Sequence, residues 1–339
     1  MGKYHSAVIA LLVFLLHSSW AYSQNGDSVE VTVLDIGPGL ATVMRLPGDY
    51  YVVYDAGDWR GGGRYSFNAI SSLIPNGEAI DLLVLSHTDS DHLGAVDELL
   101  ENYTVHKILR TGKERNSNTW KTANSAIQKA VDKKITDDFN LRYKLLPAGT
   151  SFIYGDTVLT FVSGFHIAPS DWELQEKSER NNATSIVLRL TYKDKSILFT
   201  GDAVGRHIGG HQNQLIATEK YMVNNAEKVT IDSDVLIVPH HGADNGSSTK
   251  FINAVISQWI VVSAGHQHSH PRSTTMQRFL SWGLPVNNIF RTDLGDDENE
   301  KEWPHGRIPE NKDPKGDNDI RVSITAEGVL SVNYLSEAR

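Results

Sequence analysis

Four side chains able to bind metal ions occur within six residues, directly after an apolar segment. Residues 82–85 predict a buried strand, and His87, Asp89 and Asp91 follow it at every second position. In an extended chain such side chains leave on the same side. His92 follows where a helix is expected to begin. Imidazole nitrogen and carboxylate oxygen both suit borderline to hard divalent cations, so this run predicts two adjacent cations. The alternative is that Asp91 only caps the helix.

Three more groups of polar residues follow apolar, strand-like segments. They are Asp202 after residues 196–201, His240 and His241 after residues 235–239, and His266, His268 and His270 after residues 259–265. Open α/β sheets bind ligands beyond the carboxyl ends of their strands, so we expect these groups to meet the first one. Asp202 is placed to bridge two metals, and one histidine of the 240–241 pair is expected to bind.

The remaining candidates have less specific surroundings. His270 is predicted to act on a developing negative charge or to protonate a leaving group, and the alternative is a structural role beside Pro271. We expect His266 and His268 to be exposed loop residues. Asp35 and Asp55 are predicted either to orient metal ligands or to be ordinary turn acids.

The pattern of apolar residues predicts a mixed α/β domain over residues 24–339. Alternating strands are expected at both ends of the chain, with strands and helices interleaved between them. The predicted strands are 29–35, 41–46, 51–55, 82–85, 106–109, 197–199, 235–238, 259–262, 320–325 and 330–334, and the predicted helices are 67–73, 93–103, 119–133, 212–225, 249–256 and 274–282.

The first 23 residues predict a cleaved signal peptide. Lys3 precedes an apolar run over residues 7–16, and small residues follow near position 23. The run stops at His17, short of the roughly 18 residues that a membrane anchor needs. We therefore expect a secreted or periplasmic protein without stable membrane insertion.

Composition removes several classes of site. The chain has no cysteine, which excludes disulfides and thiolate metal ligands. A formal net charge of −9 argues against a broad surface for binding polyanions, although a local basic groove remains compatible with it.

The ordered set of motifs resembles the metallo-β-lactamase superfamily, specifically the hydrolase domain of ComEC-type DNA-uptake proteins. The likeness rests on the His-x-Asp-x-Asp-His run at residues 87–92, the Leu-Phe-Thr-Gly-Asp strand end at 198–202, the His-His-Gly turn at 240–242 and His270-Pro271. It implies a four-layer αββα sandwich with metals at the edge between two sheets.

The resemblance also implies a ligand set. His87 and Asp89 would hold one metal, and Asp91 and His92 would hold the other with a histidine from the 240–241 pair. Asp202 would bridge both. The sequence departs from the common pattern at three positions: Asp89 and Asn181 stand where histidines are usual, and Pro38 stands where ComEC-like proteins have glutamine. The first site is therefore expected to be weaker or more suited to manganese.

The ligand set predicts hydrolysis by a hydroxide shared between two divalent cations, with Asp91 or His270 handling protons. Zinc is the expected metal and manganese the alternative. The resemblance favours a phosphodiesterase or nuclease, with a small molecule or a nucleic acid as substrate and no obligate protein partner. A β-lactamase, or another hydrolase of cyclic amides or esters, is the runner-up, and a non-catalytic metal-binding module is the third hypothesis.

Overall fold

The computed structural model describes residues 27–59, 62–211, 213–312 and 318–335. The predicted signal peptide lies outside these residues. In the described part of the chain no helix is both long and apolar enough to cross a bilayer.

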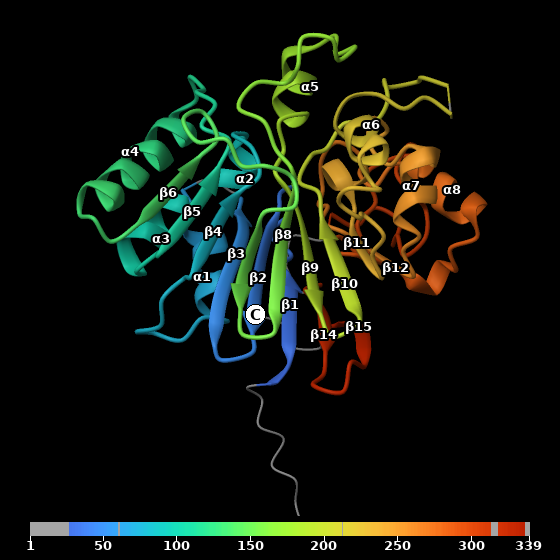
Figure 1. Ribbon diagram of the computed structural model, residues 1–339. Coiled ribbons are helices and arrows are strands. Elements are labelled where there is room, and N and C mark those ends of the chain that lie inside the picture. The colour runs from blue at the N-terminus through green and yellow to red at the C-terminus, as the bar shows by residue number, and fades with distance from the viewer. Residues whose placement is uncertain (1–26, 60–61, 212, 313–317, 336–339) are drawn as a thin grey trace, which may run out of the picture.

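Two sheets lie face to face in the middle of the molecule (Figure 1). Within the described residues, the strands of the first sheet are β1 (Val29–Val33), β2 (Ala41–Leu46), β3 (Tyr50–Ala56), β4 (Leu82–Leu85), β5 (Lys107–Arg110), β6 (Asp137–Asn140), β14 (Ile320–Ile324) and β15 (Leu330–Tyr334). Their spatial order is β15-β14-β1-β2-β3-β4-β5-β6. The pairs from β15 to β3 are antiparallel and those from β3 to β6 are parallel.

The second sheet repeats this division into an antiparallel and a parallel half. Its strands are β7 (Ser151–Tyr154), β8 (Thr157–Ser163), β9 (Val187–Tyr192), β10 (Lys195–Phe199), β11 (Val235–Ile237), β12 (Trp259–Val262) and β13 (Ile289–Arg291). The pairs from β7 to β10 are antiparallel, and those from β10 to β13 are parallel.

Helices cover the outer face of each sheet, which completes four layers (Figure 1). The first sheet packs against α1 (Arg64–Ser71), α2 (Ser90–Leu93), α3 (Val96–Asn102) and α4 (Asn118–Asp132), and the second against α6 (Ala217–Asn224), α7 (Thr249–Val255) and α8 (Ser273–Trp282). Helix α5 (Lys177–Asn182) lies at the top of Figure 1, at the end of the molecule where the sheets diverge. This arrangement confirms the predicted αββα sandwich.

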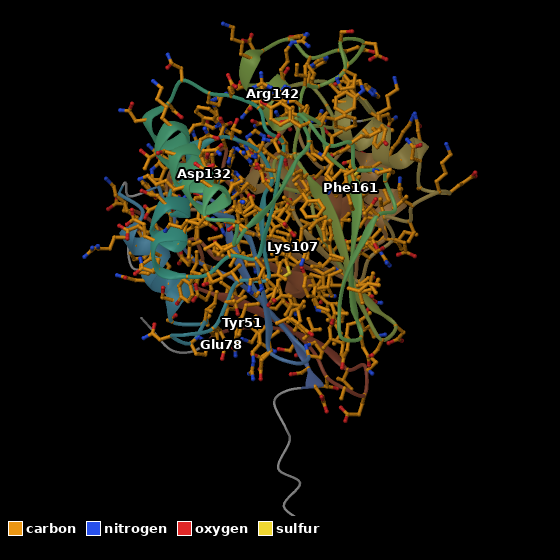
Figure 2. The ribbon with its side chains drawn as sticks, turned by 60° about the vertical axis from the view of Figure 1, so that its left-hand side comes forward. Tyr51, Glu78, Lys107, Asp132, Arg142 and Phe161 are labelled. Carbon is orange, nitrogen blue, oxygen red and sulfur yellow. The ribbon has the colours of Figure 1, made fainter. Side chains whose placement is uncertain are left out.

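The largest apolar cluster lies between the two sheets. Tyr54 of β3 lies with its ring centroid 5.3 Å from that of Phe199 of β10, and its hydroxyl donates to the carbonyl of Ile186 at 2.6 Å. Figure 2 shows Phe161 in this crowded interior, whereas Asp132 lies on the outer helix layer. Burial of large side chains on both facing surfaces stabilises the relative position of the sheets, and therefore of the loops at their shared edge.

The predicted elements differ from the observed ones where another segment of the chain approaches closely. The helix predicted over residues 93–103 is split into α2 and α3 at Gly94, where a Cβ atom would lie 2.5 Å from the amide nitrogen of Asp58. The helix predicted from residue 212 begins only at Ala217. The prediction omitted α5 and the strands β6, β7, β8, β9 and β13.

Candidate metal centre

The backbone of the loop that follows β4 is held in place by neighbouring segments of the chain. The amide of Leu40 donates to the carbonyl of Asp91 at 3.0 Å. A Cβ atom on Gly57 would lie 1.7 Å from the same carbonyl oxygen, and one on Gly39 would lie 2.7 Å from it. Only a residue without a side chain allows so close an approach. The position of this loop therefore does not depend on which ligand side chains it carries.

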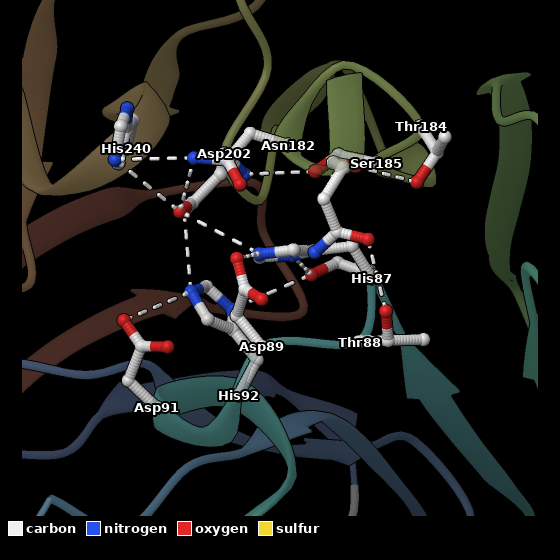
Figure 3. A network of polar contacts seen from close by, with 12 residues as sticks. His87, Thr88, Asp89, Asp91, His92, Asn182, Thr184, Ser185, Asp202 and His240 are labelled. Atoms are coloured by element: carbon white, nitrogen blue, oxygen red, sulfur yellow. Dashed lines mark hydrogen bonds and ion pairs between the residues drawn. The ribbon is translucent and has the colours of Figure 1, made fainter. Parts of the chain in front are cut away.

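Asp202 lies at the centre of four histidines. Its Oδ2 atom lies 3.6 Å from Nε2 of both His87 and His240, and its Oδ1 atom lies 3.1 Å from Nε2 of His92 (Figure 3). The same Oδ1 atom lies 3.6 Å from Nε2 of His241. The side chain of Asp202 is almost fully buried. One carboxylate thus faces four imidazole nitrogens with each oxygen between two of them.

The ligand atoms form two overlapping groups. One contains His87, His92 and Asp202, and the other contains Asp91, His92 and His241; within each group the ligand atoms lie within 4.8 Å of one another. The structure thus distinguishes the paired histidines, since His241 joins the second group while His240 lies beside Asp202. Asp91 lies within α2 and Asp89 precedes it, so the alternative reading of Asp91 as a helix cap is wrong.

Each of the four histidines has a partner for its second ring nitrogen. Nδ1 of His92 lies 2.7 Å from Oδ2 of Asp55, and Nδ1 of His241 lies 2.7 Å from the carbonyl oxygen of Ser263. The corresponding partners are Ser86 Oγ for His87 at 3.1 Å and Asn245 Oδ1 for His240 at 2.7 Å. Partners of this kind fix the tautomer and leave Nε2 as a lone-pair donor, as at the metal sites of proteins.

Asp89 is shared between the first group and a cation. Its Oδ2 atom lies 3.5 Å from Nε2 of His87, and Nη2 of Arg115 lies 2.6 Å from its Oδ1 atom. Burial alone would raise the pKa of Asp89, but the contacts with His87 and Arg115 lower it to about 2. Asp89 is therefore an anion across the physiological pH range.

The buried charges attract one another strongly. Burial opposes ionisation of Asp202, yet the surrounding histidines, His92 first, hold its pKa well below the usual range. Burial likewise opposes the charged form of His92, but Asp202, Asp55 and Asp91 raise the pKa of its ring. Such a cluster of carboxylates favours positive charge at its centre, which is the electrostatic requirement for binding a divalent cation.

The His240-His241 turn has an unusual backbone. His240 has φ 50° and ψ 48°, and His241 has φ 54° and ψ 23°, so two successive residues with side chains adopt the left-handed conformation. This conformation costs roughly 1–2 kcal/mol for each such residue. The turn brings Nε2 of His240 within 3.6 Å of Oδ2 of Asp202 and Nε2 of His241 within 3.6 Å of Oδ1. Strained backbone of this kind is typical of functional sites.

A cavity of about 660 Å³ opens beside the second group. Asp91 and His241 lie in its wall together with His270, whose ring is stacked on that of His241 at 6.4 Å with an interplanar angle of 13°. Pro38 also lines the cavity. The two residues predicted to handle protons, Asp91 and His270, therefore face the same space.

The structure separates the two aspartates that were predicted as alternatives. Asp55 is fully buried and contacts His92 directly, and it also accepts a hydrogen bond from the amide of Ser86 at 2.7 Å. Asp35 instead accepts from the amides of Gly37 and Asn318, at 3.4 and 3.2 Å. Asp55 thus orients a histidine of the site, whereas Asp35 connects loops.

One histidine and the two asparagines at the end of α5 need a closer description. His266 is half-buried and its Nδ1 atom lies 2.7 Å from Oδ1 of Asp296, so it is not simply exposed, whereas His268 is. Both asparagines reach the site: the side-chain amide of Asn182 lies 3.2 Å from Nε2 of His240, and the side chain of Asn181 lies beside Asp89 and accepts from the hydroxyl of Thr88 at 2.9 Å.

Sequence reasoning missed Arg115. It follows β5, which lies beside β4 in the parallel half of the first sheet. Because the carboxyl ends of neighbouring parallel strands share one edge, residues 111–117 belong to the same set of loops as residues 86–92. That rule would have drawn attention to the basic residues after β5.

Comparison with known proteins agrees with this geometry. Residues 34–266 match the model of the metallo-beta-lactamase superfamily. The chain is 22% identical to recombination protein 2 of Haemophilus influenzae, over 76% of this chain and 27% of that protein, and 26% identical to competence protein ComA of Neisseria gonorrhoeae, over 85% of this chain and 34% of that protein. It thus spans about a third of the length of these relatives.

Among solved structures, the chain is similar to CmlA, a diiron β-hydroxylase from Streptomyces venezuelae, with 13% identity, a TM-score of 0.46, and coverage of 79% of this chain and 53% of that one. The family match covers most of the chain and includes the histidine and aspartate loops described above. The two sheets and the helix layers are those of its fold. The chain belongs to the metallo-beta-lactamase superfamily.

Proposed function

We propose that this protein is an exported, metal-dependent hydrolase that cleaves phosphodiester bonds with the help of two divalent cations. One observation carries the proposal: four imidazole Nε2 atoms converge on the buried carboxylate of Asp202, and each ring has its Nδ1 atom bound elsewhere. Four rings that only packed in a protein core would not need this common orientation.

The residues fit a pair of cations. Nε2 of His87 and Oδ1 of Asp202 are buried without a hydrogen-bond partner among the described residues. Buried polar atoms are rarely left so, and an ion would satisfy both. We assign His87, Asp89 and Asp202 to the first cation with His240 beside them, and Asp91, His92, His241 and Asp202 to the second.

The first position is the more oxygen-rich of the two. Asp89 and Asn181 stand where the superfamily usually has histidines. Carboxylate and amide oxygens favour harder cations such as Mn²⁺ more than imidazole does. We therefore propose Zn²⁺ at the second position and either Zn²⁺ or Mn²⁺ at the first.

The catalytic roles follow from which groups face the cavity. When bound, two divalent cations supply Lewis acidity and lower the pKa of a water molecule to about 7. Asp91 and His270 line the cavity, from which each can exchange a proton with the attacking or leaving oxygen. Asp55 and Ser263 hold the rings of His92 and His241 in the orientation that this chemistry needs.

Relatives and local charge favour a phosphodiester as substrate. The recombination and competence proteins named above suggest a nucleic-acid context, and Arg115 places a guanidinium beside the first group. Guanidinium groups recognise phosphate well because they donate several hydrogen bonds in a fixed plane. Export rests on the apolar run at residues 7–16, and sequencing the N-terminus of the secreted protein would test it.

The test combines metal analysis with two substrates. We expect two equivalents of metal in the purified protein and hydrolysis of bis-p-nitrophenyl phosphate that stops on chelation and returns with Zn²⁺ or Mn²⁺. Asp202→Asn should abolish turnover, whereas Asp156→Asn, a change at an exposed aspartate, should not. Hydrolysis of nitrocefin alone would instead identify a β-lactamase. Absence of turnover with every metal would favour a binding module.

A further inference from the structure

The cavity beside the second group continues into an open groove. His268, Arg272, Glu300 and Lys301 line the cavity, and the same four residues line an adjoining space of about 520 Å³. The amide of Ser273 donates to the carbonyl of Lys301 at 2.9 Å, which joins the two chain segments that form this wall. A substrate held at the metal centre can therefore extend along the groove.

Two cations in this groove have no side-chain partner among the described residues. Within the described part of the chain, the side chains of Arg272 and Lys301 make no hydrogen bond or ion pair. By contrast, each of Arg110, Arg206, Arg278 and Arg291 is paired with a carboxylate. Unpaired cations that line a cavity on a protein of net charge −9 are available to bind an anion.

The acidic residues nearby bind other groups. Asp244 contacts Arg206 and Arg278, at 2.7 and 3.1 Å. Glu302 pairs with buried Arg291, and Glu298 accepts a hydrogen bond from the amide of Ser269. Apart from Asp91, which is assigned to the second cation, Glu300 is the remaining carboxylate of the wall, and it is exposed and lies beyond ion-pair distance of both Arg272 and Lys301. The groove therefore retains a positive charge beside the metal centre.

An aromatic surface adjoins the groove at its rim. Trp59, in the loop after β3, is 40% exposed, and its ring contacts that of His268 edge-to-face at 5.5 Å and 82°. His268 in turn lies 5.9 Å from His270. Exposed aromatic rings beside a basic groove are how proteins bind single-stranded nucleic acid, because bases stack on the rings without regard to sequence.

We propose that this groove binds the nucleotide next to the scissile phosphate of a single-stranded nucleic acid, with its phosphate at Arg272 and Lys301 and its base against Trp59. The inference rests on the proposed phosphodiesterase activity for its position relative to the reaction. A small phosphodiester would not reach Arg272, Lys301 and Trp59, so these residues would determine specificity for a nucleic acid. A base paired in a duplex has no free face for Trp59, so the groove selects single strands.

Binding to the metal-free protein tests the inference without relying on catalysis. Fluorescence anisotropy of a labelled single-stranded oligonucleotide would be measured with chelator present and with increasing salt. Arg272→Ala and Lys301→Ala should each weaken binding and lower the slope of log Kd against log salt by about 0.7. Trp59→Ala should weaken binding roughly 5- to 100-fold and leave that slope unchanged. Lys250→Ala, at an exposed lysine of α7, is the matched control.

Turnover provides the second arm. Hydrolysis of bis-p-nitrophenyl phosphate, which has neither a second phosphate nor a base, should be nearly unchanged in Trp59→Ala and Lys301→Ala, while the kcat/KM of both variants for the oligonucleotide falls at least tenfold. Unchanged oligonucleotide binding in Arg272→Ala and Trp59→Ala would overturn the inference, as would equally tight binding of duplex. If bis-p-nitrophenyl phosphate is not cleaved but the anisotropy pattern holds, the proposed activity fails and the groove assignment stands.

Discussion

Arg115 and Asp89 form an ion pair at the edge of the metal centre, with 2.6 Å between Nη2 and Oδ1. The other oxygen of the carboxylate faces His87 at 3.5 Å. Asp89 is thus shared between a protein cation and the position assigned to the first metal. Because like charges repel in a partly buried site, the guanidinium opposes binding of a divalent cation there.

Removal of this guanidinium should strengthen metal binding at the first position. We expect Arg115→Gln to bind the cation at the first position roughly tenfold more tightly. The substitution removes a positive charge that repels this cation, and the repulsion is moderate because the site lies near the protein surface, where the effective dielectric constant is high. Competition with a chromogenic chelator would measure the affinity. Arg142→Gln, which removes an exposed guanidinium paired with Glu114, is the control. Weaker binding in Arg115→Gln would show instead that Arg115 mainly holds Asp89 in place.

Asp55 should matter for the second metal position although it binds no metal itself. Asp55→Asn keeps the volume but removes the charge that faces Nδ1 of His92 at 2.7 Å. Metal affinity is expected to fall about 10- to 100-fold, as for other changes behind a metal-binding histidine. Asp35→Asn, the matched change at the other buried aspartate of this region, should leave affinity unchanged. Isothermal titration calorimetry with the metal ion would measure the affinity of both variants. Equal losses of affinity would contradict the role assigned to Asp55.

The sequence indicated which polar residues would lie together, but it indicated only part of the strands. Residues 87–92, 202 and 240–241 could be identified because each follows a short, fully apolar strand, such as Leu82–Leu85. The strand Asp137–Asn140 was missed because it lies at a sheet edge and carries two aspartates, which weakens its apolar pattern. Arg115 and Trp59 have no motif, and only the folded chain shows what they contact.

Glu219 should make the stability of the protein depend on pH. It is buried, and although the amides of Ser247 and Ser248 donate to it, desolvation raises its pKa from 4.5 to about 7. The folded state then holds a proton that the unfolded state releases. The contribution of Glu219 is complete below pH 4.5 and is lost as pH rises towards 7, by roughly 3 kcal/mol.

Urea unfolding of the metal-free protein between pH 5 and 8 would check this. Glu219→Gln should show a smaller decline in stability over that range than the unaltered protein. Glu227→Gln, at an exposed position, should retain the full decline. The idea fails if the unaltered protein and Glu219→Gln decline in parallel.

Arg291 should be essential for the loop that forms one wall of the groove. It is buried, pairs with Asp293 and Glu302, and donates to the carbonyls of Trp303 and His305. Arg291→Met would leave two buried carboxylates without their cation, which typically costs about 3–5 kcal/mol. Urea unfolding would measure the loss. Adding Asp293→Asn and Glu302→Gln should restore part of it, and no restoration would argue against charge as the cause.

Gly57 lies close to the carbonyl of Asp91, so the backbone path of residues 86–92 depends on this contact more than on the side chains that the loop carries. Because backbone atoms set the path of residues 86–92, a different ligand at position 89 would begin from the same Cα position. A histidine there, for example, could be introduced without rebuilding the loop. We therefore expect the choice of ligand at position 89 to be open to single substitutions, whereas a side chain at Gly39 or Gly57 would displace the backbone at Asp91.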